Sequence, residues 1–191
     1  MGPAPAQVER LHRLSVADFH RLGAAGVLDP SARVELVEGQ ILDMTPIGTV
    51  PATIVADLTQ RLVLAAGARA LVWCQNPIVL DEHSEVQPDL ALLQPRRQAY
   101  LLRHPRPADV LLVVEVADTS LRYDQQVKVP LYARCGIPEV WLVDTAAAVL
   151  SRYRTPAPHG YAQIERIAAP GIVRPAAMDE IAIDLSGLFG S

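Results

Sequence analysis

The sequence predicts a single α/β (α+β) domain, in which a mixed central β-sheet is flanked by α-helices. Largely apolar runs at 110–116 and 139–143 are typical of central strands that are covered on both faces. The strand–helix–strand order over 110–144 further predicts a right-handed crossover between parallel neighbours. A length of 191 residues, of which 50% are hydrophobic, suits one domain with a substantial core. We therefore expect a lead-in at 1–14 and one domain at 15–191.

The first half of the chain predicts two helices separated by a hairpin. Ser15 is a suitable N-cap for a short helix. The segment "RVELVEGQILDM" at 33–44 predicts two short strands around a Glu38–Gly39 turn. A longer helix is predicted over 49–68, with Thr49 as its cap and a proline in its first turn. Its apolar stripe comprises Ile54, Val55, Leu58, Leu62 and Ala66.

The second half predicts strands grouped around one more helix. This helix is expected over 124–135 despite Pro130, and Gly136 is expected to end it. The predicted strands lie at 71–80 with an interruption near Asn76–Pro77, at 86–93, at 110–117, at 138–144, at 148–154 and, from weaker patterns, near 161–167 and 181–185. The segments 138–144 and 148–154 are expected to form a hairpin.

Composition and charge exclude several classes of protein. A net charge of −4 argues against a broadly basic protein that coats nucleic acid. No apolar stretch approaches the roughly 20 residues needed to span a bilayer. The N-terminal segment "MGPAPAQVERLHRL" lacks the apolar middle region of a signal peptide. These observations predict a cytoplasmic protein without a membrane anchor.

A local group of arginines could still hold phosphates. Arg96, Arg97 and Arg103 lie in "QPRRQAYLLRHPRP" at 94–107, and we treat them as candidate nucleic-acid-binding residues. An exposed loop punctuated by prolines is the simpler interpretation of this segment. The five histidines show no metal-ligand spacing along the sequence.

Two carboxylates stand in segments that otherwise predict a core. Glu115 follows five consecutive apolar residues, and alternation along a strand places it on the face of Val113 and Ala117. Asp89 follows Pro88, which suits a strand start, an edge or a bulge. Because an ionised carboxylate is costly to bury alone, each of these acids needs a cationic partner.

A metal ion would satisfy both acids if their strands are neighbours. Asp89 and Glu115 offer hard oxygen ligands, which suit Mg²⁺ or Mn²⁺ better than zinc. Lys128 follows closely and shares a helix face with Asp124. Taken singly, each residue has a simpler interpretation: a turn after proline, a buried ion pair, or a surface ion pair on a helix. Their combined order favours a catalytic site.

The segments "QPDLALL" and "DVLLVVEVADTSLRYDQQVKVPLYARCGIPEVWLVD" carry a family resemblance, as does "VELVEGQILDMTPIG" upstream. The chain resembles the bacterial Uma-type restriction endonuclease family, a branch of the PD-(D/E)XK nuclease superfamily, over roughly residues 15–187. The resemblance implies a restriction-endonuclease-like core and a Mg²⁺-dependent nuclease that hydrolyses DNA with a Mg²⁺-activated water. It implies Asp89 and Glu115 as metal-binding acids, Glu35 as an accessory acid and Lys128 as the catalytic lysine.

The chain departs from the family pattern at two positions. The superfamily's lysine two residues after the strand acid is replaced by Ala117, and this branch is similar in placing a lysine on the following helix, where Lys128 stands. Relatives often open the preceding helix with a histidine, where this chain has Pro51. These departures keep open a catalytically weakened nucleic-acid-binding or scaffold module that retains the nuclease fold. A hydrolase of small molecules is a further alternative, with little beyond the versatility of folds to favour it. Cleavage of both strands of a duplex would favour a homodimer.

Overall fold

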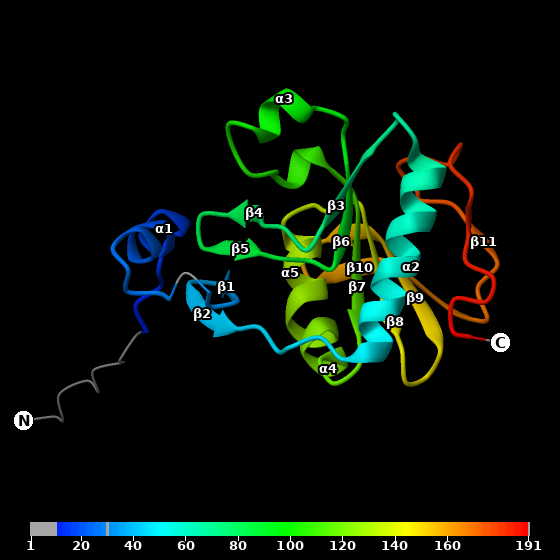
Figure 1. Ribbon diagram of the computed structural model, residues 1–191, viewed down its shortest axis with the longest axis horizontal. Coiled ribbons are helices and arrows are strands. Elements are labelled where there is room, and N and C mark those ends of the chain that lie inside the picture. The colour runs from blue at the N-terminus through cyan, green and yellow to red at the C-terminus, as the bar shows by residue number, and fades with distance from the viewer. Residues whose placement is uncertain (1–10, 30, 191) are drawn as a thin grey trace, which may run out of the picture.

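The computed structural model describes residues 11–29 and 31–190; the side chain of Arg97 also lies outside the described part. Most of the expected lead-in at 1–14 therefore falls outside it. The described chain is a mixed α+β domain. It is built around an antiparallel four-stranded sheet and a mixed six-stranded sheet (Figure 1). A smaller lobe lies beside a larger lobe that holds the six-stranded sheet (Figure 1). The smaller lobe consists of the helix α1 (Val16–Ala24) and the strands β1 (Val34–Val37), β2 (Gln40–Asp43), β4 (Ile78–Asp81) and β5 (Ser84–Val86).

The strands form three sheets. The four-stranded sheet has the order β2-β1-β5-β4, the six-stranded sheet β10-β9-β8-β7-β6-β3, and the last sheet pairs β11 with β12. Their bounds are β1 (Val34–Val37), β2 (Gln40–Asp43), β3 (Leu71–Cys74), β4 (Ile78–Asp81), β5 (Ser84–Val86), β6 (Leu90–Leu93), β7 (Val110–Ala117), β8 (Glu139–Asp144), β9 (Val149–Ala157), β10 (Gly160–Ala168), β11 (Ile172–Val173) and β12 (Ile183–Asp184).

The helices are short except for one. Their bounds are α1 (Val16–Ala24), α2 (Thr49–Ala66), α3 (Arg97–Tyr100), the 3₁₀ turn η1 (Pro107–Asp109), α4 (Leu121–Tyr123), the π-helical turn η2 (Asp124–Lys128) and α5 (Val129–Arg134). Over 11–29 and 31–190, no helix combines the length and the apolar character that crossing a bilayer requires.

The six-stranded sheet is covered on both faces, as its apolar strands predict. The helix α2 packs on one face, where Val114 and Val116 join its buried stripe. The helix α5 packs on the other face, against Val113 and Val140 (Figure 1). Strands β7 and β8 are parallel neighbours, as the sequence predicts, and Glu115 lies opposite Leu142. The alternation of β7 therefore turns Glu115 toward the side of α5.

The early elements are confirmed with small corrections. Ser15 caps α1 in a reciprocal capping box with Asp18, and the hairpin turns at Glu38 and Gly39. The predicted apolar stripe of α2 is buried. The expectation that Thr49 caps α2 is wrong: Gly48 is the N-cap, and it offers no side-chain oxygen.

The prediction of one strand over 86–93 is wrong. The strand β5 ends at Val86, and β6 begins at Leu90 in a different sheet. Pro88 separates them, because proline cannot donate a ladder hydrogen bond. The chain thus leaves the four-stranded sheet and enters the six-stranded sheet at Gln87–Asp89, which places Asp89 at the junction of the two sheets.

The predicted helix over 124–135 is present but irregular. The N–H of Val129 donates to the carbonyl of Asp124, a bond across five residues that defines the π turn. Pro130 gives a physical reason for it. Its ring has no N–H and would clash with the carbonyl of Gln126 in a regular helix, and a wider turn relieves that clash. Lys128 is the last residue of this turn.

Candidate active site

A cavity of about 170 Å³ opens where the two sheets meet. It contains all four residues that the sequence marks as catalytic: Glu35, Asp89, Glu115 and Lys128. The remaining walls are Arg33, Asp43, Met44, Thr45, Pro46, Ile47, Gly48, Pro51, Gln75, Gln87, Val116, Asp118, Thr119, Ser120, Tyr123 and Asp124. Residues separated by more than ninety positions in the chain therefore form one pocket, and Pro51 lies in its wall.

Glu115 and Lys128 form the buried centre of the site. Glu115 is 3% exposed and Lys128 is 6% exposed. The Nζ of Lys128 lies 3.2 Å from Oε1 of Glu115. The same carboxylate oxygen accepts a hydrogen bond of 2.6 Å from the hydroxyl of Tyr132, one helical turn beyond Lys128. The helix after β7 thus supplies both polar partners of Glu115.

Glu35 brings the smaller sheet into the site. It lies on β1, and its Oε2 is 3.2 Å from Nζ of Lys128. The backbone N–H of Gln87 donates to the same oxygen at 3.4 Å. Lys128 therefore bridges two acids that belong to different sheets.

Asp89 is fixed by the backbone of its neighbouring strand. The N–H of Val116 donates to Oδ2 of Asp89 at 2.8 Å. The side-chain amide of Gln75 lies 3.3 Å from Oδ1. Strands β6 and β7 pair in antiparallel register with Leu90 opposite Val114, so Asp89 and Glu115 follow as the next facing positions. The sequence predicts that these two acids converge if their strands are neighbours, and β6 and β7 are paired neighbours.

The π turn adds a further acid to the site, and the preceding helix α4 adds an unsatisfied hydroxyl. Asp124 is 4% exposed and accepts a hydrogen bond of 2.7 Å from the hydroxyl of Ser120. The buried Oη of Tyr123, also in the cavity wall, has no hydrogen-bond partner among the described residues. A buried hydroxyl without a partner indicates room for a further polar group in the cavity.

The cavity is short of positive charge. Burial raises the pKa of Glu115 to about 8, although the Lys128 ammonium opposes this. Burial likewise raises the pKa of Asp124, again against the effect of Lys128. Burial lowers the pKa of Lys128, but Glu115, Glu35 and Asp124 together outweigh it and raise that pKa above its usual range. One ammonium is thus shared among several carboxylates and cannot neutralise them all.

Oxygen atoms of acidic side chains predominate among the possible ligands in this cavity. Asp89, Glu115 and Glu35 present carboxylate oxygens to one cavity, and the unsatisfied hydroxyl of Tyr123 adds an oxygen nearby. Oxygen donors of this kind are the ligands that Mg²⁺ and Mn²⁺ prefer. A cation would also offset the cost of the buried, uncompensated carboxylates. Neither cysteine lines this cavity.

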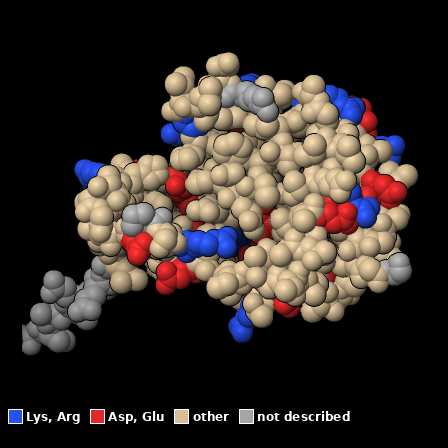
Figure 2. All heavy atoms as spheres, in the orientation of Figure 1, with Lys and Arg blue, Asp and Glu red and all other residues tan. Residues whose placement is uncertain are grey.

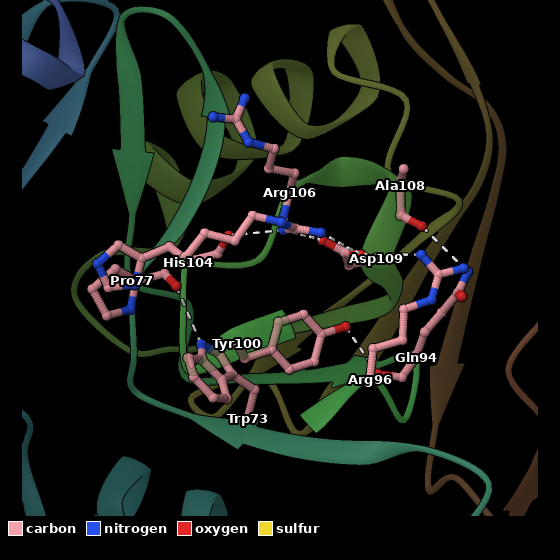
Figure 3. A network of polar contacts seen from close by, with 10 residues as sticks. Trp73, Pro77, Gln94, Arg96, Tyr100, His104, Arg106, Ala108 and Asp109 are labelled. Atoms are coloured by element: carbon pink, nitrogen blue, oxygen red, sulfur yellow. Dashed lines mark hydrogen bonds and ion pairs between the residues drawn. The ribbon is translucent and has the colours of Figure 1, made fainter. Parts of the chain in front are cut away.

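The arginine-rich segment lies at the other end of β7. Asp109, 1% exposed, precedes β7, and Arg103 donates to both of its carboxylate oxygens, at 2.7 and 3.2 Å. Arg96 lies 3.6 Å from Asp109 as well. Figure 3 shows this segment folded around Asp109, with the Tyr100 hydroxyl donating to the carbonyl of Gln94. Glu115 lies six residues further along, or about 20 Å at the rise of a strand. Nucleic-acid binding by Arg96, Arg97 and Arg103 stays a prediction. The described contacts with Asp109 give Arg96 and Arg103 a structural role.

Charged side chains are scattered over the face seen in Figure 2. Acidic and basic groups alternate there between large uncharged areas, and no broad basic surface covers that face. This distribution agrees with the net charge of −4. An encounter with nucleic acid through this face would depend on local contacts.

Sequence reasoning missed several contributors to the site, of which Tyr132 and Gln75 touch the proposed metal-binding acids. Tyr132 stands four residues after Lys128, so its position on the same helix face was a usable signal. Gln75 carries no such signal. It lies between β3 and β4 with a positive φ of 47°, and only the pairing of β3 with β6 brings it to Asp89.

Comparison with known proteins gives the chain a family and a structural neighbour. A family model described as "Uma2: Putative restriction endonuclease" matches residues 16–185. Among solved structures, the chain is similar to the crystal structure of "a putative nuclease belonging to DUF820 from Anabaena variabilis ATCC 29413". The TM-score is 0.69 at 12% identity, with 92% of this chain and 97% of that chain covered. This likeness shows a shared fold. A search of curated proteins found no match to this chain. The match over residues 16–185 shows that the chain belongs to the Uma2 family of restriction-endonuclease-like proteins.

Proposed function

We propose that this protein is a metal-dependent endonuclease that hydrolyses phosphodiester bonds in DNA. The family and the nuclease fold support the reaction class. One observation carries the assignment of the site. The Nζ of Lys128 lies 3.2 Å from both Glu35 and Glu115, in the same cavity as Asp89.

The roles follow from the contacts of each side chain. Asp89 and Glu115 would hold Mg²⁺ or Mn²⁺, with Glu35 as an accessory acid. When bound, the ion supplies Lewis-acid polarisation of the phosphate and a lower pKa for the attacking water. Lys128 keeps a positive charge beside the carboxylates, where it stabilises negative charge that develops on the phosphate oxygens. Tyr132 orients Glu115, and the Val116 N–H orients Asp89.

Hydrolysis consumes one water for each bond that is cut. The water oxygen gives up a proton as it forms a bond to phosphorus, while the bond from phosphorus to the leaving ester oxygen breaks and that oxygen takes up a proton from solvent. Glu35 lies next to Lys128 and is 6% exposed. It is therefore placed to accept the proton that the attacking water gives up.

A nucleic-acid-binding or scaffold module without catalysis is the second candidate. The observations that favour it are Ala117, which stands where the superfamily has its strand lysine, and Pro51 in the cavity wall, where relatives often have a histidine. A module of this kind would bind DNA without dependence on the two metal-binding acids.

Nicking of a supercoiled plasmid separates the two candidates. We expect cleavage that requires Mg²⁺ or Mn²⁺ and that Asp89→Asn and Glu115→Gln abolish. The matched control is Asp57→Asn, which removes a carboxylate that pairs with Arg61 on α2, outside the cavity. DNA binding without cleavage by the unaltered protein would favour the module. Equal nicking by the unaltered protein, Asp89→Asn and Glu115→Gln would refute the assigned site.

A further inference from the structure

Three potential metal ligands meet on the side of the smaller lobe, outside the catalytic cavity. His20, Glu85 and His104 each offer one ligand atom, and these atoms all lie within 4.8 Å of one another. Nε2 of His20 is 2.8 Å from Oε2 of Glu85. The rings of His20 and His104 are 6.1 Å apart and meet edge to face. None of the three residues lines the catalytic cavity.

The first ligand is held in place by the docking of α1. Val16 N–H donates to the carbonyl of Glu82 at 2.8 Å, and a ring nitrogen of His83 lies 3.0 Å from the carbonyl of Leu14. Both contacts attach the start of α1 to the β4–β5 hairpin. His20 is thereby placed over β5, which carries Glu85.

The third ligand is held by the network around Asp109. Arg103 donates both to Asp109 and to the carbonyl of His104, the latter at 3.0 Å (Figure 3). The carbonyl of Pro105 accepts a bond of 3.0 Å from the N–H of Val79 on β4. The loop is therefore fixed to the same small sheet as α1, and His104 is pre-positioned opposite His20.

Glu85 is the buried acid of this group. The side chain of Glu85 is 7% exposed, and His20 is its one ion-pair partner among the described residues. His20 and His104 line a surface cavity whose charged walls are Asp81, Glu82, Arg103 and Arg106, and Arg103 is already paired with Asp109. A buried carboxylate is stabilised by a cation.

We propose that His20, Glu85 and His104 bind Zn²⁺ or a similar divalent transition metal. Two imidazoles and a carboxylate are a ligand set that such ions take and that Mg²⁺ does not prefer. Metal–ligand bonds of about 2.0–2.2 Å place tetrahedral ligand atoms about 3.3 Å apart. The spacing within 4.8 Å is close to that requirement. The imidazoles and the carboxylate fill three positions, and solvent would take the fourth.

Such a site would join three segments that are distant in sequence. It would connect α1, the small sheet and the loop before β7, and would so stabilise the smaller lobe. Because the metal binds the folded chain, its binding free energy adds to folding stability. This inference does not depend on the proposed nuclease activity.

Zinc binding to the full chain without a histidine tag tests the proposal. Equilibrium dialysis against Zn²⁺, in excess Mg²⁺ to occupy the acidic cavity, measures binding to the unaltered protein and to variants. We expect His20→Gln and His104→Gln each to weaken Zn²⁺ binding by at least about 100-fold, since even indirect partners of a metal cost 10–100-fold. Glu85→Gln should weaken it too.

The matched control is His159→Gln, which changes an exposed histidine in the turn between β9 and β10. His159→Gln and Asp89→Asn should bind Zn²⁺ as the unaltered protein does. At free Zn²⁺ about a hundredfold above Kd, the Tm of the unaltered protein should rise by roughly 5–10 °C, and that of folded His104→Gln should not. Unchanged Zn²⁺ affinity in both His20→Gln and His104→Gln, or loss of binding only in Asp89→Asn, would overturn the proposal.

Discussion

The ammonium nitrogen of Lys128 lies 3.2 Å from Oε1 of Glu115, although the two residues belong to a helix and a strand. The strand position two residues after Glu115 holds Ala117, which is fully buried and does not line the cavity. The helix thus supplies the positive charge that the general superfamily pattern places on the strand.

Removing the ammonium should destabilise the metal-free fold. Lys128→Met leaves Glu35 and Glu115 buried without their cation, and breaking a buried pair in this way costs about 3–5 kcal/mol. Urea unfolding in EDTA at about pH 9, above the raised pKa of Glu115, measures this loss with both acids ionised. In a Glu115→Gln background the same change should cost less, because one of the two acids is no longer charged. Equal losses in both backgrounds would show that the pair is not energetically coupled.

Tyr132 should act on metal binding through Glu115. Tyr132→Phe removes the hydroxyl that donates to Glu115 at 2.6 Å and leaves the ring in the core. We expect the Mg²⁺ concentration for half-maximal cleavage to rise about 10–100-fold, as it does when partners of metal ligands are lost. The maximal rate at saturating Mg²⁺ should change less. Tyr161→Phe, which loses a hydroxyl bond to the Ile137 carbonyl elsewhere, is the control.

Pro130 should matter for activity more than for stability. Pro130→Ala restores an N–H that can bond to the carbonyl of Gln126 and so favours a regular helix. We expect unchanged or higher stability and cleavage at least about tenfold slower, because Lys128 would be rotated away from Glu115. A metal-dependent cleavage rate equal to that of the unaltered protein would show that the π turn is not needed for catalysis.

Acid should weaken the network that holds the arginine-rich loop. The hydrogen bond from Arg103 holds the pKa of Asp109 below its usual value of 3.8, with further lowering from the Arg106 N–H and Arg96. Asp109 therefore binds fewer protons in the folded state than in the unfolded state. Its contribution is present above pH 3.8 and is lost as the pH falls through the lower folded value.

The Asp109→Asn variant checks this effect. It should be less stable than the unaltered protein at neutral pH, and its stability should fall less steeply below about pH 4. Chemical unfolding at a series of pH values gives both quantities. Asp179→Asn, at an exposed position, should show the full slope. A slope in Asp109→Asn equal to that of the unaltered protein would rule out the assigned linkage.

Periodicity in the sequence was enough to predict the local elements. The stripe from Ile54 to Ala66 defined α2, and the Glu38–Gly39 turn defined the hairpin. The apolar run at 110–117 correctly predicted a core strand that carries one acid. These features depend on residues that are close together in the sequence, so the local pattern of apolar and polar residues is enough to predict them.

Features that arise from topology could not be predicted in the same way. Pro88 was noticed, yet nothing local shows that β5 and β6 enter different sheets. The meeting of His20, Glu85 and His104 joins three segments whose spacing carries no pattern. The pairing of Arg103 with Asp109 also depends on how the loop folds back. In each case, the contact is set by packing between distant segments.

We propose that Lys128, which the helix after β7 positions in the cavity, acts together with Asp89 and Glu115 in DNA cleavage. Single-turnover cleavage of a labelled DNA duplex at saturating Mg²⁺ tests it most directly, comparing the unaltered protein with Lys128→Met, Lys128→Arg and Asp57→Asn. We expect Lys128→Met to slow cleavage by about 10²–10³-fold, Lys128→Arg to recover part of the rate, and Asp57→Asn to retain all of it. A folded Lys128→Met protein that cleaves DNA at the rate of the unaltered protein would refute the catalytic role of Lys128.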